Sequence, residues 1–264
     1  MKSPAVILFA SGLLSQANAH YTFGRLIFNN TWSKTWEYVR EISPSTTITQ
    51  PDIALLAPNT EPTSTDIRCG RNASASWSKP KTATIRAGDT VGFAAGEPRL
   101  AGADVARIYH PGFASAWLSH SPTDDLNAYT GDGDWFKIMS VTGRTEQSLD
   151  FSLPENKNLY NEYKAIWGTL NVQSWNFTIP KTTPPGKYLL RFEHIFPNPQ
   201  DSQYYMTCAH VNIVNLNSAV GTPGPLVKIP GVYKRGQPDV YFDHYDLKFN
   251  ISQFVAPSPV VWVG

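Results

Sequence analysis

The chain has 264 residues, and its 22 Lys and Arg against 21 Asp and Glu give a formal net charge of +1. A charge this close to zero argues against nucleic acid or an anionic membrane surface as a partner, and favours an uncharged partner such as a neutral polysaccharide. No apolar run reaches the roughly 20 residues that a membrane-spanning helix needs. We therefore expect neither a nucleic-acid partner nor a membrane partner.

The first residues have the pattern of a secretory signal. Lys2 supplies one positive charge, residues 5–14 are almost all apolar or small, and Ala17-Asn18-Ala19 is a small-x-small cleavage site. We expect residues 1–19 to be removed and the mature protein to begin at His20. Residues 20–264 are then expected to form a single extracellular domain, since the sequence shows no repeat, linker or second module.

Two further features agree with secretion. Cys69 and Cys208 are the two cysteines of the chain, and an even count in an oxidising compartment predicts one disulfide, with a pair of free thiols as the alternative. Four Asn-x-Ser/Thr sequons are candidate glycosylation sites, and they begin at Asn29, Asn72, Asn176 and Asn250.

The apolar pattern along the chain is that of β structure. In chain order, the strands are expected over residues 82–86, 90–94, 174–179, 187–196 and 203–214. With many Pro and Gly residues between them, these strands predict an antiparallel β-sandwich. Short helices over 124–129 or 154–163 fit the pattern less strongly, and the tail after Gly221 is expected to pack on the sandwich.

A mature N-terminal histidine offers unusual metal chemistry, because its α-amine and its ring nitrogen can chelate one metal ion together. A second histidine would complete a set of three nitrogens, and nitrogen-rich tetragonal sites favour copper. His110 follows a strand region and is expected to precede a loop, where a solvated histidine is the simpler interpretation. Strand alternation places Gln203 and Tyr205 on one face and Cys208 on the other. Tyr205 alone would be interpreted as a core residue.

Taken together, these residues resemble the fungal lytic polysaccharide monooxygenases of auxiliary-activity family nine. The resemblance rests on the segments His20-Tyr21-Thr22-Phe23, Tyr109-His110-Pro111-Gly112 and Gln203-x-Tyr205-x-x-Cys208-Ala209. Several other stretches follow in the family's order and extend the resemblance over nearly all of the mature chain: 66–69, 134–138, 186–191, 221–233 and 259–262.

The resemblance implies an immunoglobulin-like or fibronectin-like β-sandwich that carries one copper ion on a flat face. By position, His20 and His110 would be the equatorial ligands, Tyr205 the axial group, and Gln203 an outer hydrogen-bond donor toward oxygen species. Cys69 and Cys208 would form the family's disulfide. Such enzymes use a small-molecule or protein electron donor, with O₂ or H₂O₂, to hydroxylate C1 or C4 of a β-1,4-glucan. We expect a monomer.

Aromatic residues beside the metal would stack on sugar rings. Tyr245 matches such a surface position, and the alternative is a tail aromatic that packs on the sandwich. The match departs from the family at Asn198, which stands where many relatives carry a histidine that assists oxygen activation. We expect the side chain of His194 to face away from that position. The loop over 43–51 lacks an aromatic that some relatives present to the substrate.

The remaining histidines are not expected to bind copper. His210 shares the face of Cys208, and we expect His120 and His244 in loops or at the surface. Two other functions are weighed against the oxidative enzyme. One is a non-catalytic copper-binding or carbohydrate-binding protein on the same fold, which the change at Asn198 motivates. The other is a glycosidase with a carboxylate pair, although no spacing singles out such a pair.

Overall fold

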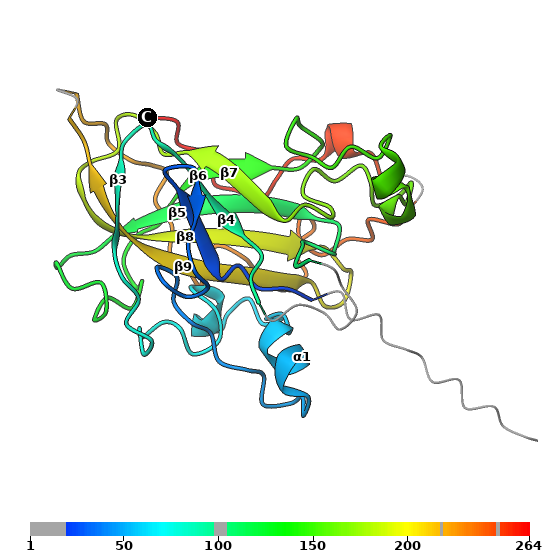
Figure 1. Ribbon diagram of the computed structural model, residues 1–264, viewed down its shortest axis with the longest axis horizontal. Coiled ribbons are helices and arrows are strands. Elements are labelled where there is room, and N and C mark those ends of the chain that lie inside the picture. Colours follow the sequence, from blue (N-terminus) through cyan, green and yellow to red (C-terminus); the bar gives the residue numbers. More distant parts are fainter. Residues whose placement is uncertain (1–19, 98–104, 217–218, 247–248) are drawn as a thin grey trace, which may run out of the picture.

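Two β-sheets form the framework of the protein. The computed structural model describes residues 20–97, 105–216, 219–246 and 249–264, so the predicted signal segment 1–19 lies outside the described residues. One sheet has the strand order β2-β1-β4-β7, and the other has the order β3-β9-β8-β5-β6 (Figure 1). The first sheet contains β1 (Arg25–Phe28), β2 (Thr31–Trp32), β4 (Thr90–Ala94) and β7 (Ser174–Thr178).

The second sheet contains the longest strands. Its members are β3 (Ala83–Arg86), β5 (Phe113–His120), β6 (Phe136–Val141), β8 (Gly186–Phe196) and β9 (Gln203–Val214). β8 and β9 pair along their whole lengths, from Gly186 opposite Ile213 to Phe196 opposite Gln203. This long antiparallel pair carries His194, Phe196, Gln203 and Tyr205, which are discussed below.

Helical segments are few and short. They are α1 (Pro51–Leu56) and the 3₁₀ turns η1 (Thr65–Ile67), η2 (Pro154–Leu159) and η3 (Ile251–Gln253). The sequence pattern anticipated a helix near η2 but not α1, and residues 124–129 form turns instead. Among the described residues, no helix has both the length and the apolar character needed to cross a membrane.

The β-sandwich predicted from the sequence is confirmed, with one pairing of a different kind. β3 runs parallel to β9, whereas the other paired strands of the described chain run antiparallel. A parallel pair cannot be joined by a tight hairpin. β3 lies far from β9 in the chain and reaches the edge of the second sheet without a hairpin, which is why alternation alone did not reveal this pairing.

The interior of the sandwich is aromatic and aliphatic. Phe192 of β8 stacks against Phe93 and Phe177 of the opposite sheet, with ring centroids 5.6 and 6.3 Å away. These side chains are almost fully buried, and burial of a large apolar side chain stabilises the fold by about 1.5–3 kcal/mol. The contact between the two sheets therefore fixes which residues of β8 and β9 face inward.

A second apolar cluster covers the outer face of the five-stranded sheet. It contains Cys208, which forms a disulfide with Cys69 as predicted. The tail contributes Ile229, Tyr233 and Val240 to this cluster. The loop that the disulfide closes is long, so the chain-entropy account assigns it about 4–5 kcal/mol. The disulfide ties the loop that carries Cys69 to β9, and apolar packing holds the C-terminal tail against the same face of the sheet.

A buried charge network lies on this outer face. Glu193 accepts hydrogen bonds from Ser115 of β5 at 2.8 Å and from Tyr233 of the tail at 2.6 Å, and it pairs with Arg191. Burial opposes the carboxylate, but Arg191 and these donors outweigh it and lower the pKa of Glu193. A buried pair of this kind is costly to break, because either partner left alone is an uncompensated charge.

Candidate metal centre

Three rings from distant parts of the sequence meet at one end of the sandwich. The ring centroids of His20 and His110 are 5.8 Å apart, and the ring of Tyr205 lies 6.2 Å from that of His20 and 5.9 Å from that of His110. Tyr205 is near the start of β9, and β8 points toward the same end, at the right of Figure 1. The structure thus brings together the three residues that the sequence analysis singled out as copper ligands.

His110 is held by a turn that lies against β8. It was expected to precede a loop, but the chain enters β5 at Phe113, three residues further on. Gly112 has a φ of 154°, and a Cβ there would lie 2.0 Å from the carbonyl oxygen of Ile195. Only glycine permits this close approach of two backbones. The glycine therefore sets how closely His110 sits against β8.

Each histidine keeps one buried ring nitrogen without a hydrogen-bond partner in the described chain, namely Nδ1 of His20 and Nε2 of His110. Burial, and then the nearby positive groups, lower the pKa of His110 to about 3. Burial and the charge of Arg71 also lower the pKa of His20. Both imidazoles are therefore neutral near pH 7, and a neutral imidazole has a lone pair that can bind a metal.

Tyr205 faces the two histidines from β9. Its hydroxyl donates a 2.6 Å hydrogen bond to Oε1 of Gln203, two residues earlier on the same face of the strand. Burial raises the pKa of Tyr205 well above its ordinary value, so the phenol keeps its proton. Because Oε1 of Gln203 accepts this bond, the NH₂ group at the other end of the amide is the donor that Gln203 can present.

Phe196 lies where it fixes the ring plane of His110. The two rings are stacked, with centroids 4.5 Å apart and planes 14° from parallel. Asn198, two residues further on, accepts hydrogen bonds through Oδ1 from the backbone N–H groups of Gln200 and Asp201. The asparagine carbonyl therefore shapes the turn between β8 and β9, and an aromatic ring packs against His110. Phe196 was not singled out from the sequence, although its alternation with His194 on β8 was readable.

Arg71 ties the loop around α1 to this end of the molecule. The guanidinium is half-buried, and its charge acts on both His20 and Tyr205. It donates hydrogen bonds to four carbonyl oxygens that flank and end the helix, those of Ser43, Ala54, Leu55 and Ala57. This role was not readable from the sequence, because backbone carbonyl oxygens are present on every residue type.

A short path of rings leads from His110 to Tyr245. Phe196 stacks on His110, His244 packs edge-on against Phe196 at 5.2 Å, and the ring of Tyr245 lies 3.8 Å from that of His244. Tyr245 is 44% exposed. His244 was expected in a loop or at the surface; it lies in a turn of the C-terminal tail, and Phe196 and Trp167 bury its ring. Tyr245 is therefore an exposed aromatic that Phe196 and His244 connect to His110.

The other histidines lie as follows. His210 points to the outer face of the sheet, as expected, where its Nε2 accepts a 2.8 Å hydrogen bond from Arg40. His120 is exposed at the end of β5. His194 lies on the inner face of β8, where its Nδ1 is 2.7 Å from the hydroxyl of Tyr21 and its ring is 6.4 Å from that of Tyr205. His194 therefore lies next to the ring cluster, which consists of the rings of His20, His110 and Tyr205.

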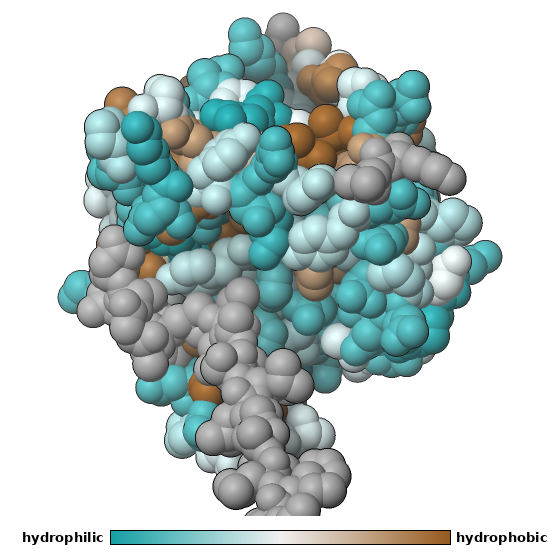
Figure 2. All heavy atoms as spheres, turned by 90° about the vertical axis from the view of Figure 1, so that its right-hand side faces the viewer, coloured by the Kyte–Doolittle hydropathy of each residue, from teal (hydrophilic) through white to brown (hydrophobic). Residues whose placement is uncertain are grey.

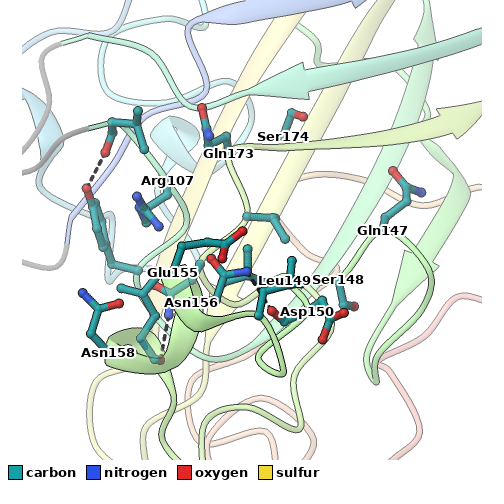
Figure 3. A pocket seen from close by; sticks show the side chains of 16 residues that line it. Arg107, Gln147, Ser148, Leu149, Asp150, Glu155, Asn156, Asn158, Gln173 and Ser174 are labelled. Carbon is teal, nitrogen blue, oxygen red and sulfur yellow. Dashed lines mark hydrogen bonds between the residues drawn. The ribbon is translucent and has the colours of Figure 1, made fainter.

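Other candidate metal sites and cavities can be compared with this arrangement within the part of the chain that the structure describes. Among the described residues, no three His, Cys, Asp or Glu side chains are grouped closely enough to hold a metal ion. A cavity of about 870 Å³ lies beside the segment that leads to His110, with Arg107, Glu155 and Gln173 around it (Figure 3). None of the residues proposed from the sequence as metal or substrate ligands lines this cavity.

The four sequons differ in their surroundings. Asn29, Asn72 and Asn250 are exposed. Asn176 is half-buried within β7, and its Oδ1 is buried without a hydrogen-bond partner in the described chain. Three of the candidate glycosylation sites are thus accessible in the folded protein, whereas Asn176 presents its side chain against the sheet.

Comparisons with known proteins match nearly the whole described chain. The family model for Auxiliary Activity family 9 (formerly GH61) matches residues 20–254. An AA9 family lytic polysaccharide monooxygenase U of Thermothielavioides terrestris is 34% identical over 268 residues, covering 94% of each chain. An AA9 family lytic polysaccharide monooxygenase D of Phanerodontia chrysosporium is also 34% identical, covering 93% of this chain and 92% of its own.

Solved structures agree on the fold. The crystal structure of a cellulose-active polysaccharide monooxygenase from M. thermophila covers 93% of this chain and all of its own, with a TM-score of 0.64 at 19% identity. That of HiLPMO9B has the same coverage, with a TM-score of 0.62 at 24% identity. At this level of identity the likeness concerns the arrangement of the two sheets.

The buried histidines predict a steep dependence of stability on pH. Burial lowers the pKa of His110, His194 and His210 to about 3 and that of His244 to about 4. Below about pH 6.5 the unfolded chain binds protons that the folded chain excludes. The free energy of unfolding of the metal-free protein should therefore fall by up to about 1.4 kcal/mol per pH unit for each histidine.

Urea unfolding of the metal-free protein between pH 7 and pH 5 measures this slope. His210→Gln keeps an acceptor for Arg40 and removes one buried titrating group that lies away from the ring cluster. It should therefore reduce the pH dependence of the free energy of unfolding by up to about 1.4 kcal/mol per pH unit, the contribution of one histidine. A free energy of unfolding that stays constant from pH 7 to pH 5 would show that these imidazoles are not buried in neutral form.

Proposed function

Because the chain belongs to Auxiliary Activity family 9, we propose that His20, His110 and Tyr205 form the copper site of a lytic polysaccharide monooxygenase. Members of this family are extracellular fungal enzymes that cleave polysaccharide oxidatively and depend on copper. The observation that carries the proposal for the site is the pair of buried imidazole nitrogens, on His20 and His110, that have no partner in the described chain.

The residues present fit a copper ion. Cleavage after Ala19 would free the α-amine of His20, and this amine with Nδ1 would bind one metal through two nitrogens. Nε2 of His110 would supply a third nitrogen, and Tyr205 would lie beside the ion, since its ring is close to both histidine rings. Three nitrogens in a tetragonal arrangement suit copper. Bound copper would supply one-electron chemistry with O₂ or H₂O₂, which leads to hydroxylation of a sugar carbon.

The neighbouring side chains would orient the reactants. Gln203 would present its NH₂ group toward the oxygen species, because its carbonyl already accepts the hydrogen bond from Tyr205. Tyr205 would stay a neutral phenol, because burial raises its pKa well above the ordinary value. Phe196 would hold the ring plane of His110. These contacts would limit the motion of the ligands during turnover.

The substrate would be cellulose or a related β-1,4-glucan, attacked at C1, at C4 or at both. Tyr245 would stack on a sugar ring beside the metal, since it is exposed and connected to His110 by a short path of rings. The end of the molecule that faces the viewer in Figure 2 is largely hydrophilic where it is visible, which suits contact with a hydrated, uncharged polymer. A small-molecule or protein reductant would deliver electrons.

The remaining assignments rest on the sequence. Residues 1–19 would be a secretory signal, and residues 20–264 a single catalytic domain that acts as a monomer outside the cell. The even charge balance supports a substrate that is neither nucleic acid nor membrane. Asn29, Asn72, Asn176 and Asn250 remain the candidate glycosylation sites.

One observation favours a second function on the same fold. Asn198 stands where the family resemblance leads us to expect a histidine, and its carbonyl is engaged in a turn. Asparagine cannot transfer a proton near neutral pH as histidine can. A non-catalytic copper-binding or carbohydrate-binding protein would retain the ring cluster without needing that proton transfer. Mass spectrometry of the products separates the two functions, because only the enzyme releases oxidised oligosaccharides.

Replacement of His20 tests the proposed site. In the secreted, copper-loaded protein, His20→Ala removes a ring ligand and should lower the release of oxidised oligosaccharides by more than about 100-fold, beyond the loss typical of an outer partner. His120→Ala is the matched control, because His120 is exposed at the end of β5. Products are measured by mass spectrometry on several glucans with reductant. If His20→Ala retains the turnover of the control, the assignment of His20 is wrong.

Tyr245 can be tested separately from the metal. Tyr245→Ala should weaken binding to insoluble glucan by roughly two- to tenfold, the size of about one aromatic contact, and leave copper affinity unchanged. Trp32→Ala removes another exposed aromatic, 41% exposed on β2, and serves as the control in the same pull-down assay. Equal binding of both variants and the parent would exclude Tyr245 from the substrate contact.

A further inference from the structure

Tyr21, the residue that follows the proposed ligand His20, is buried beside the rings of His110 and Tyr205. Its side chain is 3% exposed. Its ring stacks on that of Tyr205, with centroids 4.1 Å apart and planes 22° from parallel. It also lies 6.3 Å from the ring of His110 and packs edge-on against Phe23 at 5.6 Å. One side chain thus contacts two of the three groups proposed to face the metal and is bonded in the chain to the third.

The hydroxyl of Tyr21 has a specific partner. It lies 2.7 Å from Nδ1 of His194, and both residues are buried. His194 is on the inner face of β8, opposite Tyr205 in the antiparallel register. The long pairing of β8 with β9 therefore fixes the position of the His194 imidazole relative to Tyr205. A buried hydroxyl costs stability unless it is hydrogen-bonded, so this contact determines how Tyr21 is seated.

A purely apolar role would not require this arrangement. Phenylalanine would fill nearly the same volume as Tyr21, and His194 is a costly residue to bury for packing alone. Tyr21 also lies one residue from the chain terminus once residues 1–19 are removed. Terminal residues are mobile unless contacts hold them. Beyond Tyr21, the nearest such contacts on this segment are the hydrogen bonds that the carbonyls of Thr22 and Phe23 accept from Gly96 and Thr207, each at or below 2.9 Å.

We propose that Tyr21 and His194 form a positioning pair that anchors the mature N-terminus and fixes the ring plane of Tyr205 at the copper site. This inference rests on the proposed function. The hydrogen bond to β8 holds Tyr21, and Tyr21 in turn limits the movement of His20, one residue away. The ring of Tyr21 packs on one face of the Tyr205 ring, and Oε1 of Gln203 accepts a hydrogen bond from the Tyr205 hydroxyl. The two devices together preorganise the ligands before the metal binds.

The test compares copper binding in variants of the secreted mature protein. Tyr21→Phe removes the hydroxyl and keeps the ring, and Tyr21→Leu also removes the stacked ring. His194→Phe removes the partner and serves as a second route if either Tyr21 variant fails to fold. The matched control is Tyr188→Phe, because the buried Tyr188 at the other end of β8 donates its hydroxyl to the carbonyl of Pro184 at 2.9 Å.

The readouts are the Cu(II) dissociation constant by chelator competition, the Cu(II) electron paramagnetic resonance spectrum, and the melting temperature. Tyr21→Phe and His194→Phe should each weaken copper binding by about tenfold or more, as loss of a ligand's supporting partner does. Tyr21→Leu should in addition change the spectrum, because Tyr205 loses the ring behind it. Tyr188→Phe should lower the melting temperature while keeping the dissociation constant and spectrum of the parent.

The double variant Tyr21→Phe with His194→Phe should bind copper no more weakly than either single variant, since both remove the same contact. Copper affinity and spectra equal to those of the parent in every variant would overturn the positioning role. A parent protein that neither binds copper nor releases oxidised products would instead overturn the proposed function. The two failures are therefore distinguishable.

Discussion

The end of a polypeptide chain is the hardest part of it to hold still, and the proposed copper site depends on doing so. Segment 20–23 lies against the inner face of β8 and β9, where Tyr21 stacks on Tyr205 and bonds to His194. Thr207 of β9 then holds the carbonyl of Phe23 at 2.8 Å. A terminal amine can act as a ligand only if such contacts offset the entropy of an otherwise free end.

The two faces of β9 have different roles: the inner face contributes to the proposed copper site, and the outer face stabilises the fold. Gln203, Tyr205 and Thr207 face the sandwich interior, where they line the ring cluster and hold the N-terminal segment. Cys208 lies on the outer face, and its disulfide to Cys69 ties down the loop that also carries Arg71. Arg71 in turn holds the segment around α1, and its charge acts on His20. A change on the outer face of β9 can therefore reach the proposed copper site through one loop.

The sequence predicted those features that depend on local pattern. β9 was expected at the bounds observed, because alternation over twelve residues with a cysteine on one face leaves little freedom of register. The cysteine count predicted the disulfide, and the order of the family segments identified the ring cluster. What local pattern does not contain is the contact between distant residues. The stack of Phe196 on His110, the bond from Tyr21 to His194 and the burial of His244 all join segments far apart in the chain. The hydrogen bonds of Arg71 to backbone carbonyl oxygens were also not predictable, because every residue type has such an oxygen.

The mass of the first peptide of the secreted protein, measured together with the copper spectrum of the same sample, tests the account most directly. A peptide that begins at His20, and a Cu(II) spectrum with hyperfine structure from three nitrogens, are the predicted result, because the amine and two imidazoles are then all available. A mature chain that begins at any other residue would leave His20 without its amine, and would contradict the proposed site whatever the fold.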